Sequence, residues 1–186
     1  MMIKIFPFIF ILLWSSAFIT TKPIIDNSDP FAALAFRFAL VALGFFLFSI
    51  YSKQKILAKM RNFFESFFSG VLFHGFYLGG VFYSISIGMP TAIAALIVTL
   101  QPVLTNALSG PILNEKVSAK QWLGVLLGFA GAGLVLGFDI GSKIPTNGLI
   151  ATVIALLAIT FSTLWQKKLS NSLPLSVSNM NQAFGG

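Results

Sequence analysis

A few polar and aromatic residues lie inside otherwise apolar stretches of the sequence, where they could contact a ligand. Arg37 is the clearest case, because a charge in hydrocarbon costs about 3 kcal/mol and usually faces a cavity or a partner. It lies seven residues after Pro30, or about 10 Å along a helix. Arg37 is therefore expected either to meet an anionic or carboxylate-bearing substrate, or to extend toward the membrane–water interface on the outer side of the bilayer.

Other side chains of this kind occur in three further stretches. Trp14 precedes two serines, Tyr77 lies in a third stretch, and Gln101 precedes Pro102 in a fourth. Proline removes a backbone hydrogen bond, and bent or broken helices at mid-membrane depth often line substrate cavities. Helix–helix hydrogen bonding explains the polar residues equally well. The predicted cavity residues are Trp14, Arg37, Tyr77, Gln101 and Pro102.

The same residue types exclude most reaction chemistry. The chain has no cysteine and one histidine, His74, so thiolate metal sites, Fe–S clusters and bis-His haem are excluded. A Ser84–His74 pair lacks the sequence context of a serine nucleophile. The sequence predicts no enzyme, catalytic residue, metal or cofactor.

The composition indicates a membrane protein. Of 186 residues, 56% are hydrophobic and 9% charged, with a mean hydropathy of +0.90, whereas soluble domains carry about 25% charged residues. A cytosolic enzyme, a disordered tail and a nucleic-acid binder are all excluded. The net charge of +7 comes from short loops, where basic residues set topology. The expected partners are membrane lipids and a small-molecule substrate, with no nucleic acid.

Six apolar stretches are long enough for helices that cross about 30 Å of hydrocarbon. None shows the strict alternation of a barrel strand. The sequence therefore predicts an all-α, polytopic membrane helix bundle of six transmembrane helices plus a partial seventh. The stretches are Ile5 to Thr21, Pro30 to Tyr51, Phe67 to Ile87, Thr91 to Leu113, Gln121 to Phe138 and Gly148 to Leu164.

The basic residues orient these helices. With the N-terminus inside, the positive-inside rule places Lys22 and Lys143 outside and Arg37 within a span. An alternative for the first stretch is a signal peptide with a small-residue cleavage site at Ser15-Ser16-Ala17. The basic residues predicted to lie inside are Lys4, Lys53, Lys55, Lys59, Arg61, Lys116, Lys120, Lys167 and Lys168.

Glycines recur at helical spacing in two of the stretches. Small residues three or four positions apart share one helix face and let two backbones approach closely. These residues are predicted to pack helices together, and they could also form a dimer face. They are Gly75, Gly79, Gly124, Gly128, Gly131 and Gly133.

The segment from Ala92 to Leu136 resembles EamA-type permeases of the drug/metabolite transporter superfamily. Pro102 matches the family's fourth helix, which ends in a Glu-Lys turn, and a Gly-rich fifth helix follows. Asn114 stands where the family usually has glycine, and asparagine also tolerates a left-handed helix end. The early chain agrees at Trp14, Pro30 and Arg37. The further matching positions are Glu115, Lys116, Gln121, Gly124, Gly131 and Gly133.

The resemblance implies one complete five-helix repeat at residues 5–137 and the start of a second at 148–186. Because five is odd, the second copy of the ten-helix fold would be inverted in the membrane. The expected function is a permease that exports small organic metabolites, such as amino acids, their derivatives or drugs, by alternating access.

The alternative is a transport-inactive truncated protein, or a half-transporter that needs a homodimer or its missing second half. Residue usage suggests an AT-rich bacterial genome and hence the bacterial inner membrane, as a multi-pass protein.

Overall fold

The computed structural model describes residues 5–54, 60–114, 117–136, 144–169 and 173–186, and every regular element among them is a helix. The first two are α1 (Phe6–Asn27) and α2 (Pro30–Tyr51). A continuous helix follows, made of α3 (Met60–Gly70), the π-helix η2 (Val71–Leu78) and α4 (Gly79–Ser86). The later elements are α5 (Thr91–Val98), α6 (Gln101–Leu113), α7 (Ala119–Leu136), α8 (Thr146–Leu169) and α9 (Leu175–Ala183).

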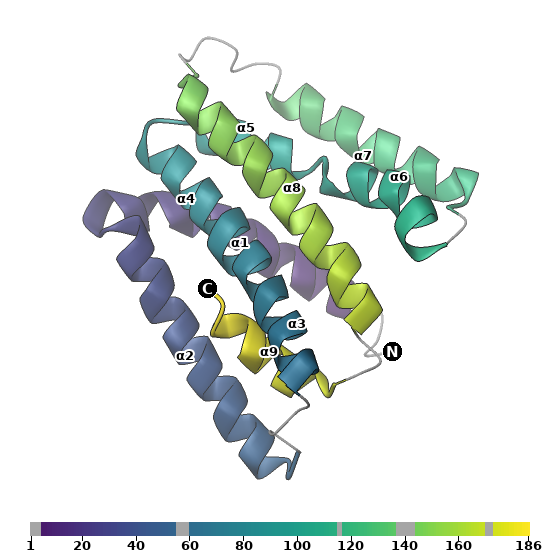
Figure 1. Ribbon diagram of the computed structural model, residues 1–186. Coiled ribbons are helices and arrows are strands. Elements are labelled where there is room, and N and C mark those ends of the chain that lie inside the picture. The colour runs from purple at the N-terminus through teal and green to yellow at the C-terminus, as the bar shows by residue number, and fades with distance from the viewer. Residues whose placement is uncertain (1–4, 55–59, 115–116, 137–143, 170–172) are drawn as a thin grey trace.

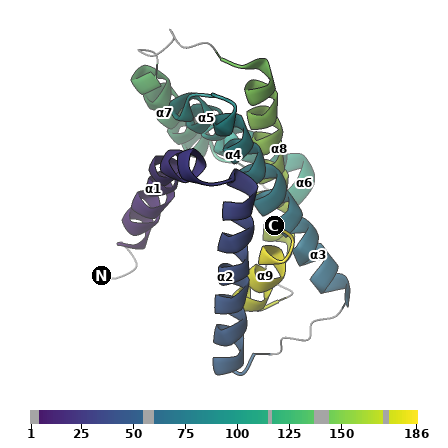
Figure 2. The same cartoon turned by 90° about the vertical axis from the view of Figure 1, so that its left-hand side faces the viewer.

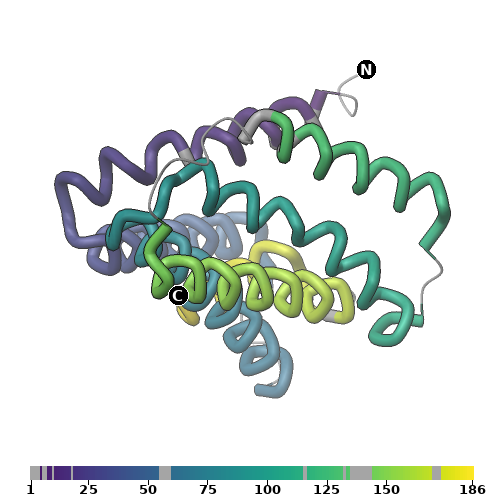
Figure 3. The backbone as a smooth tube through the Cα atoms, turned by 90° about the horizontal axis from the view of Figure 1, so that it is seen from above, coloured from purple at the N-terminus to yellow at the C-terminus, as the bar shows by residue number. Residues whose placement is uncertain are grey.

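Helix α8 lies at the centre of the bundle, against η2, α4, α5 and α6 (Figure 1). Helices α5 and α6 lie between α8 and α7, and α7 follows the same edge of the molecule as α1 (Figure 3). The core is formed where α4, α5 and α8 meet, around Val81, Ala94 and Ile159. Dispersion contacts hold such a core together, because lipid offers no hydrophobic driving force between helices.

Local sequence signals explain where several helices begin and end. Asp29 caps α2 by accepting hydrogen bonds from the backbone N–H groups of Phe31 and Ala32, at 3.0 and 2.8 Å. Pro30 follows at the first helical position, where a missing N–H costs nothing. Asn114 ends α6 in the left-handed conformation, with φ of 55°. The structure confirms that asparagine serves here as a helix terminator.

Two of the predicted stretches have a different internal structure. The third begins at Met60 rather than Phe67, because Arg61 and Glu65 continue the helix as an i,i+4 ion pair with Nε–Oε1 of 3.4 Å. The fourth is interrupted between Val98 and Gln101, just before Pro102. Pro102 has no N–H to donate to the preceding turn, so the helical ladder cannot run through it.

Four helical stretches within the described residues are long and apolar enough to cross a membrane: Pro30–Tyr51, Met60–Ser86, Thr91–Leu113 and Thr146–Lys168. Their exposed faces carry large apolar side chains such as Phe36 and Leu40. Helices α1 and α7 occupy two more predicted stretches, and their crossing stays a prediction, as does the ten-helix repeat.

The partial seventh helix and the predicted orientation need separate comment. Helix α9 has nine residues, too few for a span of about 20, and it packs between α2 and α3. The predicted end of the fifth stretch, Phe138, lies outside the described residues, as does the Glu115–Lys116 turn. The orientation with the N-terminus inside stays a prediction. Four further basic residues used for it lie outside the described residues: Lys4, Lys55, Lys59 and Lys143.

Candidate functional site

One cavity of the molecule lies between α1, α2 and the continuous helix formed by η2 and α4. Its volume is about 200 Å³. Its lining includes one cation, the hydroxyl groups of Thr21 and Tyr77, and several aromatic rings, and we call it the Arg37 cavity. Its principal lining residues are Trp14, Thr21, Arg37, Phe73, Tyr77 and Phe82.

Arg37 reaches this cavity because its helix is held by its neighbours. Leu34 and Phe38 are buried on α2 and pack with Phe82 of α4, whereas Arg37 itself is exposed. No acidic side chain among the described residues forms an ion pair with Arg37. A guanidinium presents five N–H donors in a planar fork that matches a carboxylate, so this site can bind an anionic group.

An aromatic wall stands opposite. The Trp14 indole lies parallel to the Tyr77 ring at an interplanar angle of 9° and a centroid distance of 6.5 Å. Phe73 meets Tyr77 edge to face at 5.4 Å. Both Phe73 and Tyr77 belong to the π-helix, a backbone form that is frequent at functional sites. These rings can pack against the apolar part of a small ligand.

The second cavity is larger and carries no charged residue in its lining. Its volume is about 640 Å³, and we call it the Gln101 cavity. The break before Pro102 opens the wall here, and Gln101 Nε2 donates a hydrogen bond to Thr163 Oγ1 at 3.0 Å. Its polar and aromatic lining residues are Trp14, Ser15, Phe73, Thr99, Gln101 and Thr163.

The structure distributes the predicted cavity residues over the two cavities. Arg37 and Tyr77 line the Arg37 cavity, Gln101 and Pro102 line the Gln101 cavity, and Trp14 lines both. A role for any of them in binding stays a prediction. His74 is not among the lining residues of either cavity and lies between the rings of Phe38 and Phe73, at 4.3 and 5.1 Å.

Among the lining residues that sequence reasoning missed, three are informative: Phe73, Thr21 and Thr163. Helical spacing could have found two of them. Phe73 is four residues before Tyr77, and Thr21 is seven residues after Trp14, so each shares a helix face with a predicted residue. Thr163 carries no such signal, since only the packing of α8 against α6 brings it to Gln101.

The predicted packing glycines differ in their surroundings. A Cβ at Gly75 or Gly79 would meet other described atoms at 3.9 or 3.7 Å. A Cβ at any of the four predicted glycines of α7 would meet nothing within 4 Å, so a packing role for that face stays a prediction. The four are Gly124, Gly128, Gly131 and Gly133.

Closer helix contacts occur at glycines that were not predicted. The tightest is Gly70, where a Cβ would lie 2.0 Å from the carbonyl oxygen of Gln182. At Gly80 a Cβ would lie 3.1 Å from the carbonyl oxygen of Ala151.

Comparison with known proteins supplies the family. A protein of Salmonella typhimurium described as a probable amino-acid metabolite efflux pump is 23% identical over 165 residues, which cover 88% of this chain and 53% of the relative. The chain thus spans about half the length of that curated relative. No solved structure matches the chain. The model of the EamA-like transporter family matches residues 1–137.

The family match extends over most of the chain and over the helices that line the Arg37 cavity, whereas α8, which contributes Ile159 and Thr163 to the Gln101 cavity, lies beyond it. It agrees with four apolar helices of membrane-spanning length and with the description of the relative as a probable amino-acid metabolite efflux pump. The protein is therefore a multi-pass membrane protein. The chain belongs to the EamA-like transporter family.

Proposed function

We propose that this chain forms the greater part of a permease that exports small organic metabolites by alternating access. The substrates are amino acids, their derivatives or drugs. Three observations support this: the family match, the description of the relative as a metabolite efflux pump, and a cavity of ligand size between membrane helices. In the complete transporter a second, inverted repeat would pair with residues 5–137 around a central substrate path.

The observation that carries the proposal is the exposed guanidinium of Arg37 beside an aromatic wall. A cation in a membrane helix is costly and marks a substrate path or a paired site. Arg37 has no ion-pair partner among the described residues. A carboxylate-bearing solute would supply the missing charge, and the rings of Trp14 and Tyr77 would contact its apolar part.

The location follows from the same reasoning. The protein would lie in a bacterial inner membrane with its N-terminus inside and with lipid against its exposed apolar faces. Its partners would be its small-molecule substrate and either a second copy of the chain or a second half.

Counterflow in proteoliposomes tests the function. The substrate pair is radiolabelled phenylalanine and the corresponding amine, which lacks the carboxylate. We expect Arg37→Ala to lower phenylalanine exchange by about tenfold, since a charge-assisted hydrogen bond contributes about 1.5–3 kcal/mol. Exchange of the amine should not fall, and Arg37→Lys should retain part of the phenylalanine rate.

Arg61→Ala is the matched control, because Arg61 is 84% exposed and pairs with Glu65 away from both cavities. Equal phenylalanine exchange by wild type and Arg37→Ala would contradict the role of Arg37.

A second proposal is that the chain is transport-inactive by itself and works as a half-transporter. It is supported by the length of the relative, because the alignment with this chain covers only 53% of it. Proteoliposomes would then show no exchange for any variant. Exchange would appear on genetic fusion of a second copy, or on co-reconstitution with the missing half.

A further inference from the structure

The Arg37 cavity and the Gln101 cavity share two lining residues, Trp14 and Phe73. We propose that Trp14 is a movable partition between these cavities and limits the size of the solute that passes from one to the other. This inference rests on the proposed function in one respect: it treats both cavities as parts of one substrate path.

One side of the partition is fixed to the core. Phe73 and Tyr77 lie on η2, which packs closely along α8. Tyr77 is 2% exposed and belongs to the core cluster that contains Ile159 of α8. A displacement of these two rings would require the central helix pair to separate, so they form the stationary wall.

The other side is carried by α1, whose side chains are mostly exposed. Among the described side chains of α1, only Thr21 is buried. Leu12 and Leu13, next to Trp14, are 71% and 67% exposed, and Trp14 itself is 36% exposed. The indole faces the fixed wall through its parallel contact with Tyr77. Trp14 can therefore withdraw with α1 without disturbing the core.

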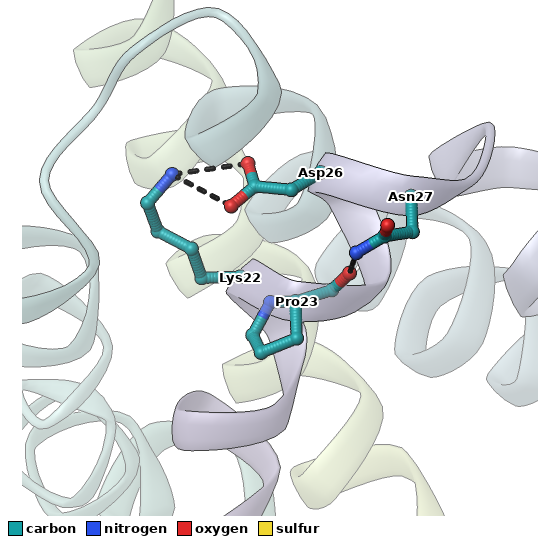
Figure 4. A network of polar contacts seen from close by, with 4 residues as sticks. All are labelled: Lys22, Pro23, Asp26 and Asn27. Atoms are coloured by element: carbon teal, nitrogen blue, oxygen red, sulfur yellow. Dashed lines mark hydrogen bonds and ion pairs between the residues drawn. The ribbon is translucent and has the colours of Figure 1, made fainter.

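A pivot for this motion lies near the C-terminal end of α1. Pro23 inside the helix has no N–H to donate to the preceding turn, and proline is a common site of helix bending. The residues around it are tied together locally (Figure 4). Lys22 Nζ pairs with Asp26 at 3.1 Å, and Asn27 Nδ2 donates to the carbonyl of Pro23 at 2.8 Å.

The path of α1 agrees with such a pivot. From the junction with α2 toward its N-terminal end, α1 diverges from α2 (Figure 2) and contacts α4 and α5. The junction itself is held by the Asp29 cap of α2. The segment that carries Trp14 thus lies on the N-terminal side of the Pro23 pivot, about which it can swing relative to α2.

The two cavities differ in chemistry, which gives the partition a function. The Arg37 cavity has a cation and aromatic rings, whereas the Gln101 cavity has the neutral groups of Ser15, Thr99 and Gln101. A carboxylate held at Arg37 cannot enter the neutral cavity until the indole moves. The side chain at position 14 therefore decides how large a solute passes.

Cysteine labelling tests the partition, because the chain has no cysteine of its own. Thr21→Cys reports on the Arg37 cavity and Thr99→Cys on the Gln101 cavity. The probe is the anionic reagent sulfonatoethyl methanethiosulfonate, added to the outside of intact cells. We expect Trp14→Ala to raise the labelling rate at Thr99→Cys by about tenfold, which corresponds to about 1.4 kcal/mol of barrier. Trp14→Phe should give a smaller increase, and labelling at Thr21→Cys should stay within twofold.

Leu12→Ala is the matched control, because Leu12 is 71% exposed, is not among the lining residues of either cavity, and lies two residues before Trp14 on α1. It should leave the rate at Thr99→Cys unchanged. If Trp14→Ala fails to reach the membrane, Trp14→Phe carries the test. The proposal is overturned if Thr99→Cys reacts equally fast with tryptophan and with the smaller residue. Labelling needs no net transport, so the two proposals can fail independently. If only the transport activity is wrong, counterflow will be absent while Trp14→Ala still raises the labelling rate at Thr99→Cys.

Discussion

The hydroxyl oxygens of Ser69 and Ser162 lie 3.0 Å apart and join α3 to α8, although the residues are 93 positions apart in the chain. Ser162 Oγ also lies 3.0 Å from the backbone carbonyl of Ser69, and Gln166 Nε2 donates to Ser162 Oγ at 3.1 Å. Both serines are fully buried. This cluster ties the predicted first helix of a second repeat to the third helix of the first.

Removal of the Ser162 hydroxyl should weaken the bundle. We expect Ser162→Ala to lower the free energy of unfolding by about 1 kcal/mol, because interhelical hydrogen bonds in membranes contribute about 0.6–2 kcal/mol. Thermal unfolding in detergent measures the change, and it is monitored as the loss of the monodisperse peak in size-exclusion chromatography. Ser84→Ala is the matched control, since Ser84 is equally buried but bonds only to Val81 of its own helix. An equal loss in both variants would contradict the interhelical role.

The close approach of α9 to α3 should make Gly70 intolerant of any side chain. A Cβ there would lie 2.0 Å from the backbone oxygen of Gln182, so Gly70→Ala must displace α9. We expect a loss of about 1–3 kcal/mol of stability, the usual range for overpacking. Gly44→Ala on α2 is the control, because a Cβ at Gly44 meets nothing within 4 Å. The same thermal assay distinguishes them, and an unchanged melting temperature for Gly70→Ala would contradict this packing of α9.

The start of α2 should depend on the Asp29 side chain. Asp29→Ala removes the acceptor for two backbone N–H groups and should destabilise the protein by about 1 kcal/mol, as N-cap losses do. Asp26→Ala removes only an exposed ion pair with Lys22, and such pairs contribute about 0–1 kcal/mol. Urea unfolding monitored by circular dichroism compares the two variants. A larger effect at Asp26 than at Asp29 would rule out the cap as the stronger contribution.

The bond between Gln101 and Thr163 should appear as a coupling energy. In a double-mutant cycle of Gln101→Ala and Thr163→Val, we expect a coupling of about 0.6 kcal/mol, the average for polar pairs between membrane helices. Thermal unfolding of the four proteins provides the cycle. Fully additive losses would mean that the bond at 3.0 Å contributes no net stability.

The sequence predicted the helices best where local chemistry sets their ends. The stretch Pro30–Tyr51 coincides with α2 residue for residue, because Asp29 and Pro30 form a complete helix start. The break before Pro102 follows from the missing N–H of proline. The third helix begins at Met60, seven residues before the predicted start. A hydropathy pattern ends at the first charged residues, whereas the backbone hydrogen bonds of the helix continue through them.

By itself, the sequence determined that this is an all-helical membrane protein and which residues inside its apolar stretches are polar, aromatic or charged. Hydropathy, charge and caps act over a few residues and can be read directly. Tertiary structure alone decided that Arg37 and Gln101 line different cavities, that Trp14 and Phe73 line both, and that Thr163 meets Gln101. These relationships depend on the rotation and crossing of packed helices, which arise from contacts summed over the whole bundle rather than from any local pattern.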